Sequence, residues 1–261
     1  MRPARSPLSP LRALALVMML CLALDSRAGL DEVVARAKRS VVAVGTYADL
    51  ANPRFEFRGS GFAVADGNLV ITNAHVLPES AASSPAADGQ PRLVVMVPMK
   101  GGNPGLRSAT LVTADPAHDL ALLRIDGPAL PALLVGDAKD VREGQSIAFI
   151  GFPIGGVLGF SPVTHRGIVS SITAIALPMP AARQLNAKAI QRLRAGSFDI
   201  YQLDATAYPG NSGGPVFDVD TGAVIGVINM VLVKGTKESA LSQPSGITYA
   251  VPASFVAEIL K

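Results

Sequence analysis

The sequence predicts an all-β fold, either a barrel or a sandwich. From residue 40 onward, most of the chain reads as short apolar runs separated by Gly, Pro, Asp and Asn. Such runs recur roughly every ten residues, whereas helical patterns are confined to the two edges and to one central stretch, 180–196. The predicted strands are 40–46, 59–65, 69–76, 92–98, 119–125, 146–152, 163–172, 222–233 and 246–251.

A polar, glycine-bounded stretch at 136–145 separates two β-rich halves of the chain. Residues 78–91 are rich in Ser, Ala and Pro, a low-complexity composition typical of a surface loop. The helical patterns at 30–40 and 252–261 border the β-rich region, so we expect these helices to be short and peripheral.

The first 28 residues have the three-part pattern of a secretory signal. Three arginines precede an apolar run at 13–24, and the pattern ends on the small side chain of Ala28. This run is too short to span a bilayer comfortably, so we expect no stable membrane anchor after signal removal. Lipidation is not expected either, because Leu20 rather than a small residue precedes Cys21. The mature protein is therefore expected to be exported, to a periplasm or out of the cell.

Removing residues 1–28 also changes the charge balance. Four of the 23 Lys and Arg residues and one of the 20 Asp and Glu residues leave with them, which makes the mature chain neutral. A neutral chain gives no argument for a nucleic-acid partner, which is bound through an excess of basic charge. The single cysteine leaves too, so core burial alone must hold the mature chain, and a composition that is 49% hydrophobic permits this.

Three residues at strand ends or turns could carry the chemistry of a serine hydrolase. His75 follows the run "VITNA", Asp119 opens "DLALLRI", and Ser212 lies in the glycine-rich "YPGNSGGP". A serine hydroxyl is a poor nucleophile until an imidazole takes its proton and a carboxylate orients that imidazole. Backbone N–H groups beside the serine can stabilise an oxyanion, and Gly210 has no side chain to block the approach.

Each of these residues has a structural alternative when it is taken singly. A histidine at a strand end is more often structural, an aspartate there often caps a turn, and short glycine-rich strings recur by chance.

The chain order separates the competing hydrolases. An α/β-hydrolase needs its histidine after the serine, but the last histidine, His165, precedes Ser212. A subtilisin-like order would need Asp66 as the acid and helices between the strands, which the pattern lacks. The order His, Asp, Ser on an all-β chain is that of chymotrypsin.

The segments around these residues resemble the catalytic segments of trypsin-like serine peptidases, and most closely those of the HtrA/Deg branch. The resemblance covers residues 32–260, almost the whole mature chain. The three catalytic segments are "TNAHV" (72–76), "DLALL" (119–123) and "GNSGGP" (210–215). Four further segments match in order and spacing: "GFPIG" (151–155), "VTHRGIVSSI" (163–172), "QLDA" (202–205) and "GITYAVP" (246–252).

The resemblance implies two six-stranded antiparallel β-barrels with short peripheral helices, and an active site in the cleft between the barrels. Both barrels would belong to one protease domain at 29–261, the first covering about 40–135 and the second about 145–252. In this family arrangement Ser212 attacks, His75 transfers the proton and Asp119 orients His75. The backbone N–H groups of Gly210 and Ser212 would form the oxyanion hole. No cofactor is implied, and the three histidines share no metal-ligand spacing, so no metal site is expected.

The resemblance also implies which residues line the S1 pocket and so set substrate preference. In the family, the S1 pocket is walled by the segment before the serine and by the following strand, here 204–208 and 226–230. The pocket residues implied, which favour a small or medium apolar P1 side chain, are Thr206, Ala207, Val227 and Ile228.

Other residues near these segments have simpler interpretations. Asn211 replaces the aspartate that pairs with a freed N-terminal amine in digestive members, so activation by N-terminal cleavage is not expected. Asp115 precedes Pro116 and is expected to start a turn. His118 would lie on the opposite face of an extended segment from Asp119, so we expect it at the surface.

The chain departs from the HtrA branch in two respects. The residues after Ser212 are used by the last strands and helix, so no PDZ domain is expected. The aromatic-rich N-terminal segment that builds the family's trimers is not evident, which leaves the oligomeric state open, a trimer included. The stretch at 180–196, with four basic side chains and no acidic one, resembles the branch's mobile regulatory loop; a solvated helix is the alternative.

The sequence thus predicts an exported serine endopeptidase that cleaves unfolded or extended polypeptides. The alternative is a catalytically weak, chaperone-like module that binds peptides on the same fold. A third interpretation is an esterase or another acyl transferase with the same triad. The complete set of Ser, His and Asp favours an enzyme, because a binding module has no chemical need for all three.

Overall fold

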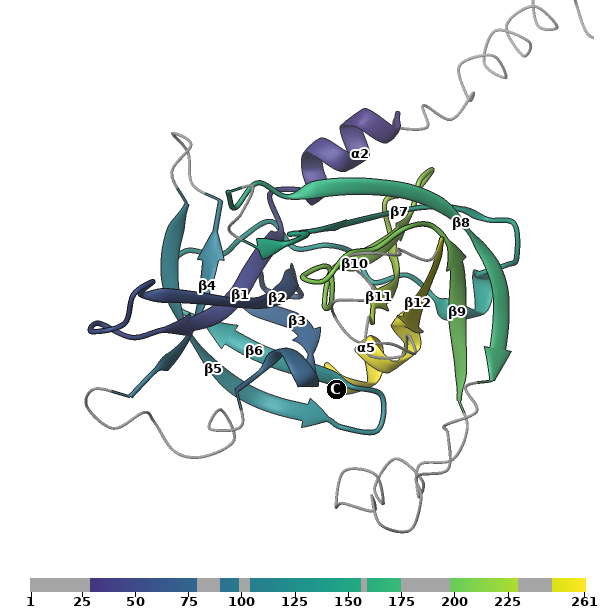
Figure 1. Ribbon diagram of the computed structural model, residues 1–261. Helices are drawn as coiled ribbons and strands as arrows, with labels where there is room; N and C mark the ends of the chain where they lie inside the picture. Colours follow the sequence, from purple (N-terminus) through teal and green to yellow (C-terminus); the bar gives the residue numbers. More distant parts are fainter. Residues whose placement is uncertain (1–28, 79–89, 99–103, 156–158, 175–197, 230–245) are drawn as a thin grey trace, which may run out of the picture.

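The computed structural model describes residues 29–78, 90–98, 104–155, 159–174, 198–229 and 246–261. Within these ranges, strands β1 to β12 form two closed barrels of six antiparallel strands each (Figure 1). This arrangement confirms the predicted fold class. The expected signal at 1–28 and the basic stretch at 180–196 lie outside the described residues.

The first barrel joins its strands in the order β1-β2-β3-β6-β5-β4. β5 was not predicted, because most of its residues are exposed or half-buried and a register shift interrupts its alternation. β3 is shorter than predicted, since the chain turns into the 3₁₀ helix Ala74–Val76. The strands are β1 (Val41–Tyr47), β2 (Phe55–Val64), β3 (Leu69–Asn73), β4 (Arg92–Val97), β5 (Gly105–Asp115) and β6 (Leu120–Ile125).

The second barrel repeats this topology, with its strands joined in the order β7-β8-β9-β12-β11-β10. β9 and β10 were not predicted as strands, and β10 is only four residues long. The strands are β7 (Ser146–Gly151), β8 (Val163–Ala174), β9 (Asp199–Asp204), β10 (Pro215–Asp218), β11 (Val224–Ile228) and β12 (Ile247–Pro252).

Three clusters of buried apolar side chains hold the barrels together. One fills the first barrel, one fills the second, and the third lies between them. β1 shows how one strand serves two clusters, because successive side chains point to opposite faces. Val42 and Val44 enter the first barrel, whereas Val41 and Ala43 join Phe217 of the second barrel in the shared cluster. The two barrels therefore pack face to face and position the segments that meet at their boundary.

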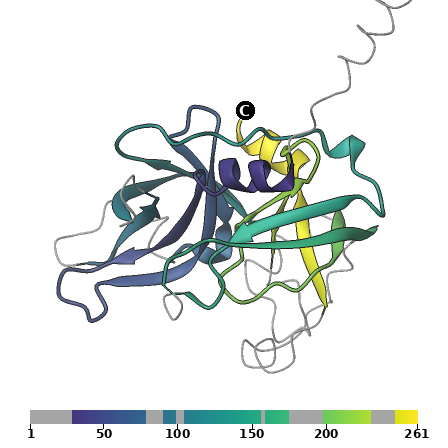
Figure 2. The ribbon, with the colours of Figure 1, turned by 90° about the horizontal axis from the view of Figure 1, so that it is seen from above.

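The helices predicted at the two edges are confirmed as α2 (Leu30–Ala37) and α5 (Ala253–Ile259). α2 lies over the junction of the barrels, and its Val33 and Ala37 enter the shared cluster (Figure 2). α5 packs against β5 and β6 of the first barrel and β11 and β12 of the second. Among the described residues, no helix has the length and apolarity needed to cross a membrane.

Candidate active site

Asp119 lies in the turn between β5 and β6, where its backbone has a φ of 56°. Non-glycine residues seldom adopt this left-handed conformation, so surrounding contacts must hold it. The backbone N–H of Ala74 and the side-chain amide of Asn73 both donate to the Asp119 carbonyl oxygen at 3.0 Å. The end of β3 therefore fixes how Asp119, only 6% exposed, presents its carboxylate.

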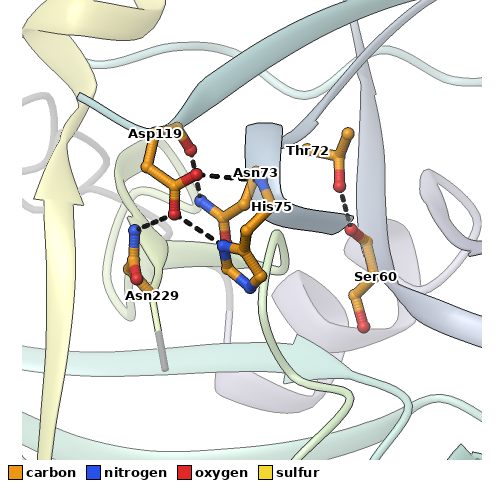
Figure 3. A network of polar contacts seen from close by, with 6 residues as sticks. All are labelled: Ser60, Thr72, Asn73, His75, Asp119 and Asn229. Carbon is orange, nitrogen blue, oxygen red and sulfur yellow. Dashed lines mark hydrogen bonds and ion pairs between the residues drawn. The ribbon is translucent and has the colours of Figure 1, made fainter. Parts of the chain in front are cut away.

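The carboxylate of Asp119 binds His75 through both of its oxygens (Figure 3). Nδ1 of His75 lies 2.6 Å from Oδ2, and the backbone N–H of His75 donates to Oδ1 at 2.9 Å. A carboxylate at this position favours the imidazole tautomer with its proton on Nδ1, which leaves Nε2 free to accept a proton. The structure thus brings together two of the predicted catalytic residues in the geometry of a base and its orienting acid.

A residue that the sequence analysis did not assign to the catalytic group also binds this carboxylate. Asn229, 1% exposed, donates its side-chain N–H to Oδ2 of Asp119 at 2.9 Å (Figure 3). It follows β11 directly and so reaches Asp119 from the second barrel. A polar residue at the end of a fully buried apolar strand is the signal that could have identified it. Asp119 therefore accepts three N–H bonds through its carboxylate, two from His75 and one from Asn229.

Ser212 lies in a tight loop, residues 208–214, that we call the nucleophile loop. Gly210 and Gly213 have φ of +102° and +85°, values that favour glycine. The loop closes through a bond of 2.9 Å from the N–H of Gly214 to the carbonyl of Asn211. Ser212 is 5% exposed. The glycines of this loop thus support a backbone conformation that other residues would strain.

Close packing also favours glycine at two positions of this loop. A Cβ on Gly213 would overlap the carbonyl oxygen of Ser60, and one on Gly214 would overlap that of Ile150. Both contacts are with backbone, which cannot move aside as a flexible side chain can. The glycine-rich pattern of the nucleophile loop therefore reflects packing against both barrels.

β2 places the nucleophile loop beside the segment that carries His75. A Cβ on Gly59 would lie 2.6 Å from the side chain of Val76 and 3.0 Å from the carbonyl oxygen of Ser212. The N–H of Ser60 donates to that same carbonyl at 2.8 Å. The segment after His75 and the main chain of Ser212 therefore flank one short stretch of β2.

The peptide that ends in the N–H of Gly210 is held from one side. The carbonyl of Pro209 accepts a bond of 2.8 Å from the N–H of Ile154. C=O and N–H point in opposite directions across a trans peptide, so the N–H of Gly210 points away from Ile154. Among the described residues, no backbone carbonyl accepts a hydrogen bond from this N–H. Such an N–H is a suitable donor for an oxyanion.

The four residues predicted to line S1 are all at least half-buried. Val227 and Ile228 have no exposed surface, and Ala207 is 5% exposed. Ile228 and Ala207 pack in the interior of the second barrel, whereas Val227 packs between the barrels. Thr206 is half-buried. Their assignment to S1 stays a prediction.

The expectation that His118 lies at the surface is wrong. Residues 116–119 form a turn rather than an extended segment, and Asp115 caps it by accepting the N–H groups of Ala117 and His118. The turn brings the imidazole of His118 onto the ring of Phe255, with centroids 3.7 Å apart, and its Nδ1 to 2.5 Å from Asp115. The side chain of His118 is therefore only 18% exposed.

His165 lies beside the nucleophile loop on the side of the second barrel. Its ring stacks on Phe149 with centroids 4.7 Å apart, and its Nε2 lies 3.5 Å from Nδ2 of Asn211. Burial lowers the pKa of His165, because desolvation disfavours the charged imidazolium. In the part of the chain that the structure describes, no three His, Cys, Asp or Glu side chains are grouped to hold a metal ion.

Comparisons with known proteins agree with this geometry. Residues 59–227 match the model of the trypsin-like peptidase domain family. A probable periplasmic serine endoprotease, DegP-like, from Halomonas elongata is 30% identical over 74% of this chain and 32% of its own length. Human serine protease HTRA3 is 32% identical over 77% of this chain and 37% of its own length. The chain thus spans only about a third of the length of these relatives.

Solved structures give the same result. The HtrA-type protease AlgW with a tripeptide matches with a TM-score of 0.59 and 26% identity, over 89% of this chain and 62% of that one. Deg5 matches with a TM-score of 0.60 and 25% identity, over 87% of this chain and 89% of that one. The family model covers well over half of the sequence, and the two six-stranded barrels are consistent with the fold of that family. The chain therefore belongs to the trypsin-like peptidase domain family.

Proposed function

We propose that this protein is a serine endopeptidase in which Ser212 is the nucleophile, His75 the general base and Asp119 the residue that orients the base. The contact of 2.6 Å between Nδ1 of His75 and Oδ2 of Asp119 carries the proposal. It presents Nε2 of the imidazole as the proton acceptor, which is the state a general base needs. The position of the nucleophile loop beside β2, next to the segment of His75, supports the choice of Ser212.

The reaction proceeds through an ester on Ser212. Its Oγ adds to the carbonyl carbon of the scissile peptide while its proton passes to Nε2 of His75. The imidazolium returns that proton to the leaving amine as the C–N bond breaks. A water then attacks the ester, loses a proton to His75, and releases the acid product as Ser212 regains its proton. The N–H groups of Gly210 and Ser212 stabilise the oxyanion at each tetrahedral stage.

We propose unfolded or extended polypeptides as the substrates, with a small or medium apolar residue at P1, and export as the route to the site of action. The relatives described above include a probable periplasmic serine endoprotease and the serine protease HTRA3. The pattern of residues 1–28 is that of a secretory signal. The P1 preference follows from the family resemblance, which implies uncharged residues, Thr206, Ala207, Val227 and Ile228, around S1.

Labelling with a fluorophosphonate probe tests the proposal, because the probe reacts covalently with an activated serine. We expect wild type to be labelled and to cleave unfolded casein. Ser212→Ala removes the nucleophile and His75→Ala removes the base, so both variants should lose labelling and cleavage.

Each other outcome contradicts a defined part of the proposal. An unlabelled wild type that still binds unfolded casein would favour the peptide-binding module. A wild type that is labelled and hydrolyses esters but not casein would favour an esterase. Labelling that persists in Ser212→Ala would show that another residue is the nucleophile.

A further inference from the structure

Ser60 is a buried residue of β2 with a hydroxyl that contacts the opposite barrel. It has no exposed surface. Its Oγ accepts a hydrogen bond of 3.0 Å from the N–H of Phe152 and donates one of 2.6 Å to the carbonyl of Gly210. A serine hydroxyl carries one proton, and the N–H of Phe152 can only donate. The proton of Ser60 is therefore directed at the carbonyl of Gly210.

This bond acts on the peptides that flank the expected oxyanion donor. The carbonyl of Gly210 is held by Ser60, and the preceding carbonyl, that of Pro209, is held by the N–H of Ile154 at 2.8 Å. Both carbonyls adjoin Gly210, which has a φ of +102°. Because a glycine has no side chain, its φ and ψ can change with little steric resistance. With both carbonyls held, rotation of either peptide breaks one of these two hydrogen bonds. The Ile154 bond fixes the peptide that carries the Gly210 N–H, and the Ser60 bond fixes the next peptide, so together they restrict rotation on both sides of the Gly210 Cα.

The main chain of Ser60 is itself held in place. Its N–H donates to the carbonyl of Ser212 at 2.8 Å, and its carbonyl accepts a bond of 2.7 Å from Oγ1 of Thr72 on β3 (Figure 3). Ser60 thus contacts the nucleophile loop on both sides of Asn211, at Gly210 and at Ser212. With its backbone held on both sides, only the χ1 torsion of Ser60 decides where its hydroxyl lies.

The same stretch of β2 also holds the segment that carries the general base. Nε of Arg58 donates to the carbonyl of Val76 at 2.6 Å, and Nη2 of Arg58 donates to that of Leu77 at 3.2 Å. These carbonyls follow His75 directly in the chain. One short stretch, residues 58–60, therefore contacts the main chain of both segments of the expected reaction, the one after the base and the nucleophile loop.

We propose that Ser60 is a positioning residue for hydrolysis, which keeps the N–H of Gly210 directed at the oxyanion by holding the Gly210 carbonyl. The proposal rests on the proposed function, because it concerns the same site. It differs from a packing role in what it predicts. A packing role predicts lost stability, whereas a positioning role predicts that transition-state binding is lost while substrate binding is kept.

Ser60→Ala tests the proposal, because it removes the hydroxyl and leaves the backbone bonds. We expect kcat on a peptide substrate to fall by roughly tenfold to a hundredfold, with KM unchanged within about twofold. The affinity for a peptide boronic acid, which forms the tetrahedral adduct, should fall by the same factor. Ser60→Cys, with a weaker donor of similar shape, should give an intermediate kcat.

Ser40→Ala is the matched control. Ser40 is a serine of the same barrel with 1% exposure, and its hydroxyl has no hydrogen-bond partner among the described residues. We expect this variant to keep wild-type kcat, KM and boronic acid affinity. Far-ultraviolet circular dichroism at the assay temperature verifies that all variants are folded.

The outcomes separate this inference from the proposed function. A wild type without fluorophosphonate labelling overturns both. A labelled wild type with unchanged kcat in Ser60→Ala overturns the role of Ser60 alone. The same holds if KM rises in proportion to the loss of kcat/KM, or if Ser60→Ala loses no more boronic acid affinity than Ser40→Ala. An unfolded Ser60→Ala moves the test to Ser60→Cys, for which wild-type kcat and boronic acid affinity overturn the role.

Discussion

The two sides of the candidate site are held by different kinds of interaction. The base side, residues 73–76 with Asp119, centres on one buried carboxylate that accepts three N–H bonds. The nucleophile loop contains no charged side chain and is held through its backbone, by bonds to Ser60, Ile154 and Ile228 and by glycines without room for a Cβ. We therefore expect the base side to lose its function when the charge of the carboxylate is removed. We expect the nucleophile loop to be destabilised when volume is added to its glycines.

The largest effect should come from removing the charge on the base side. Asp119→Asn keeps the shape but replaces an acceptor-only group by an amide, which favours the wrong tautomer of His75. We expect kcat to fall by about 10⁴-fold. Steady-state hydrolysis of a peptide substrate measures this loss.

Asp115→Asn is its control, because Asp115 forms the second Asp–His pair, with His118 at 2.5 Å. An Asn there keeps an oxygen that can cap the turn, so kcat should stay near that of wild type. An equal loss of kcat in the two variants would mean that the turn, and not the catalytic carboxylate, controls activity.

The nucleophile loop should instead be most sensitive to added volume. Gly213→Ala adds a Cβ at φ +85° against the carbonyl of Ser60. Left-handed strain and overpacking together should lower the free energy of unfolding by about 2–5 kcal/mol. Urea denaturation of wild type and variant measures the difference.

Gly144→Ala separates strain from contact in that experiment. Gly144 has nearly the same φ, +83°, but a Cβ there would have nothing within 4 Å. It should lower the free energy of unfolding by about 1–2 kcal/mol through strain alone. If Gly144→Ala and Gly213→Ala lower the free energy of unfolding equally, the contact of the loop with Ser60 contributes nothing to the effect of Gly213→Ala.

Local features of the sequence predicted most strands of the fold. The nine predicted strands all match strands of the two barrels, because they are apolar runs bounded by turn residues. β5 was not predicted because few of its residues are buried. β10 was not predicted because four residues are too few to show an alternation of apolar and polar side chains. His118 was placed wrongly because an extended segment was assumed where Asp115 caps a turn.

The contacts that join the two sides could not be predicted. Ser60 and Gly210 are 150 residues apart in the chain, and Asn229 and Asp119 are 110 apart. Neither Ser60 nor Asn229 differs by residue type from serines and asparagines that only cap turns. What selects them is the packing of one barrel against the other, which no local pattern contains.

A smaller effect is expected where the second barrel supports the base side. Asn229→Ala removes one of the three donors to the Asp119 carboxylate. A hydrogen bond to a charged group contributes about 1.5 kcal/mol or more, so kcat should fall about tenfold.

Asn68→Ala is the contrast, because Asn68 donates to the carbonyls of Ile125 and Gly127 in the first barrel. It should lower Tm and leave kcat unchanged. A normal kcat in Asn229→Ala would mean that the first barrel alone holds the base side.

The smallest expected effect concerns the pH dependence of stability beside the nucleophile loop. Burial lowers the pKa of His165, so the unfolded chain binds its proton more readily than the folded protein does. The free energy of unfolding should therefore be unaffected by His165 above its ordinary pKa of about 6.5, and should decrease as pH falls below that value. His165→Gln removes this titration and keeps a polar side chain near Asn211. Between pH 7.5 and pH 5, the variant should lose less stability than wild type. Urea midpoints at both pH values measure the difference, and equal losses would show that the buried imidazole does not make this side of the site sensitive to acid.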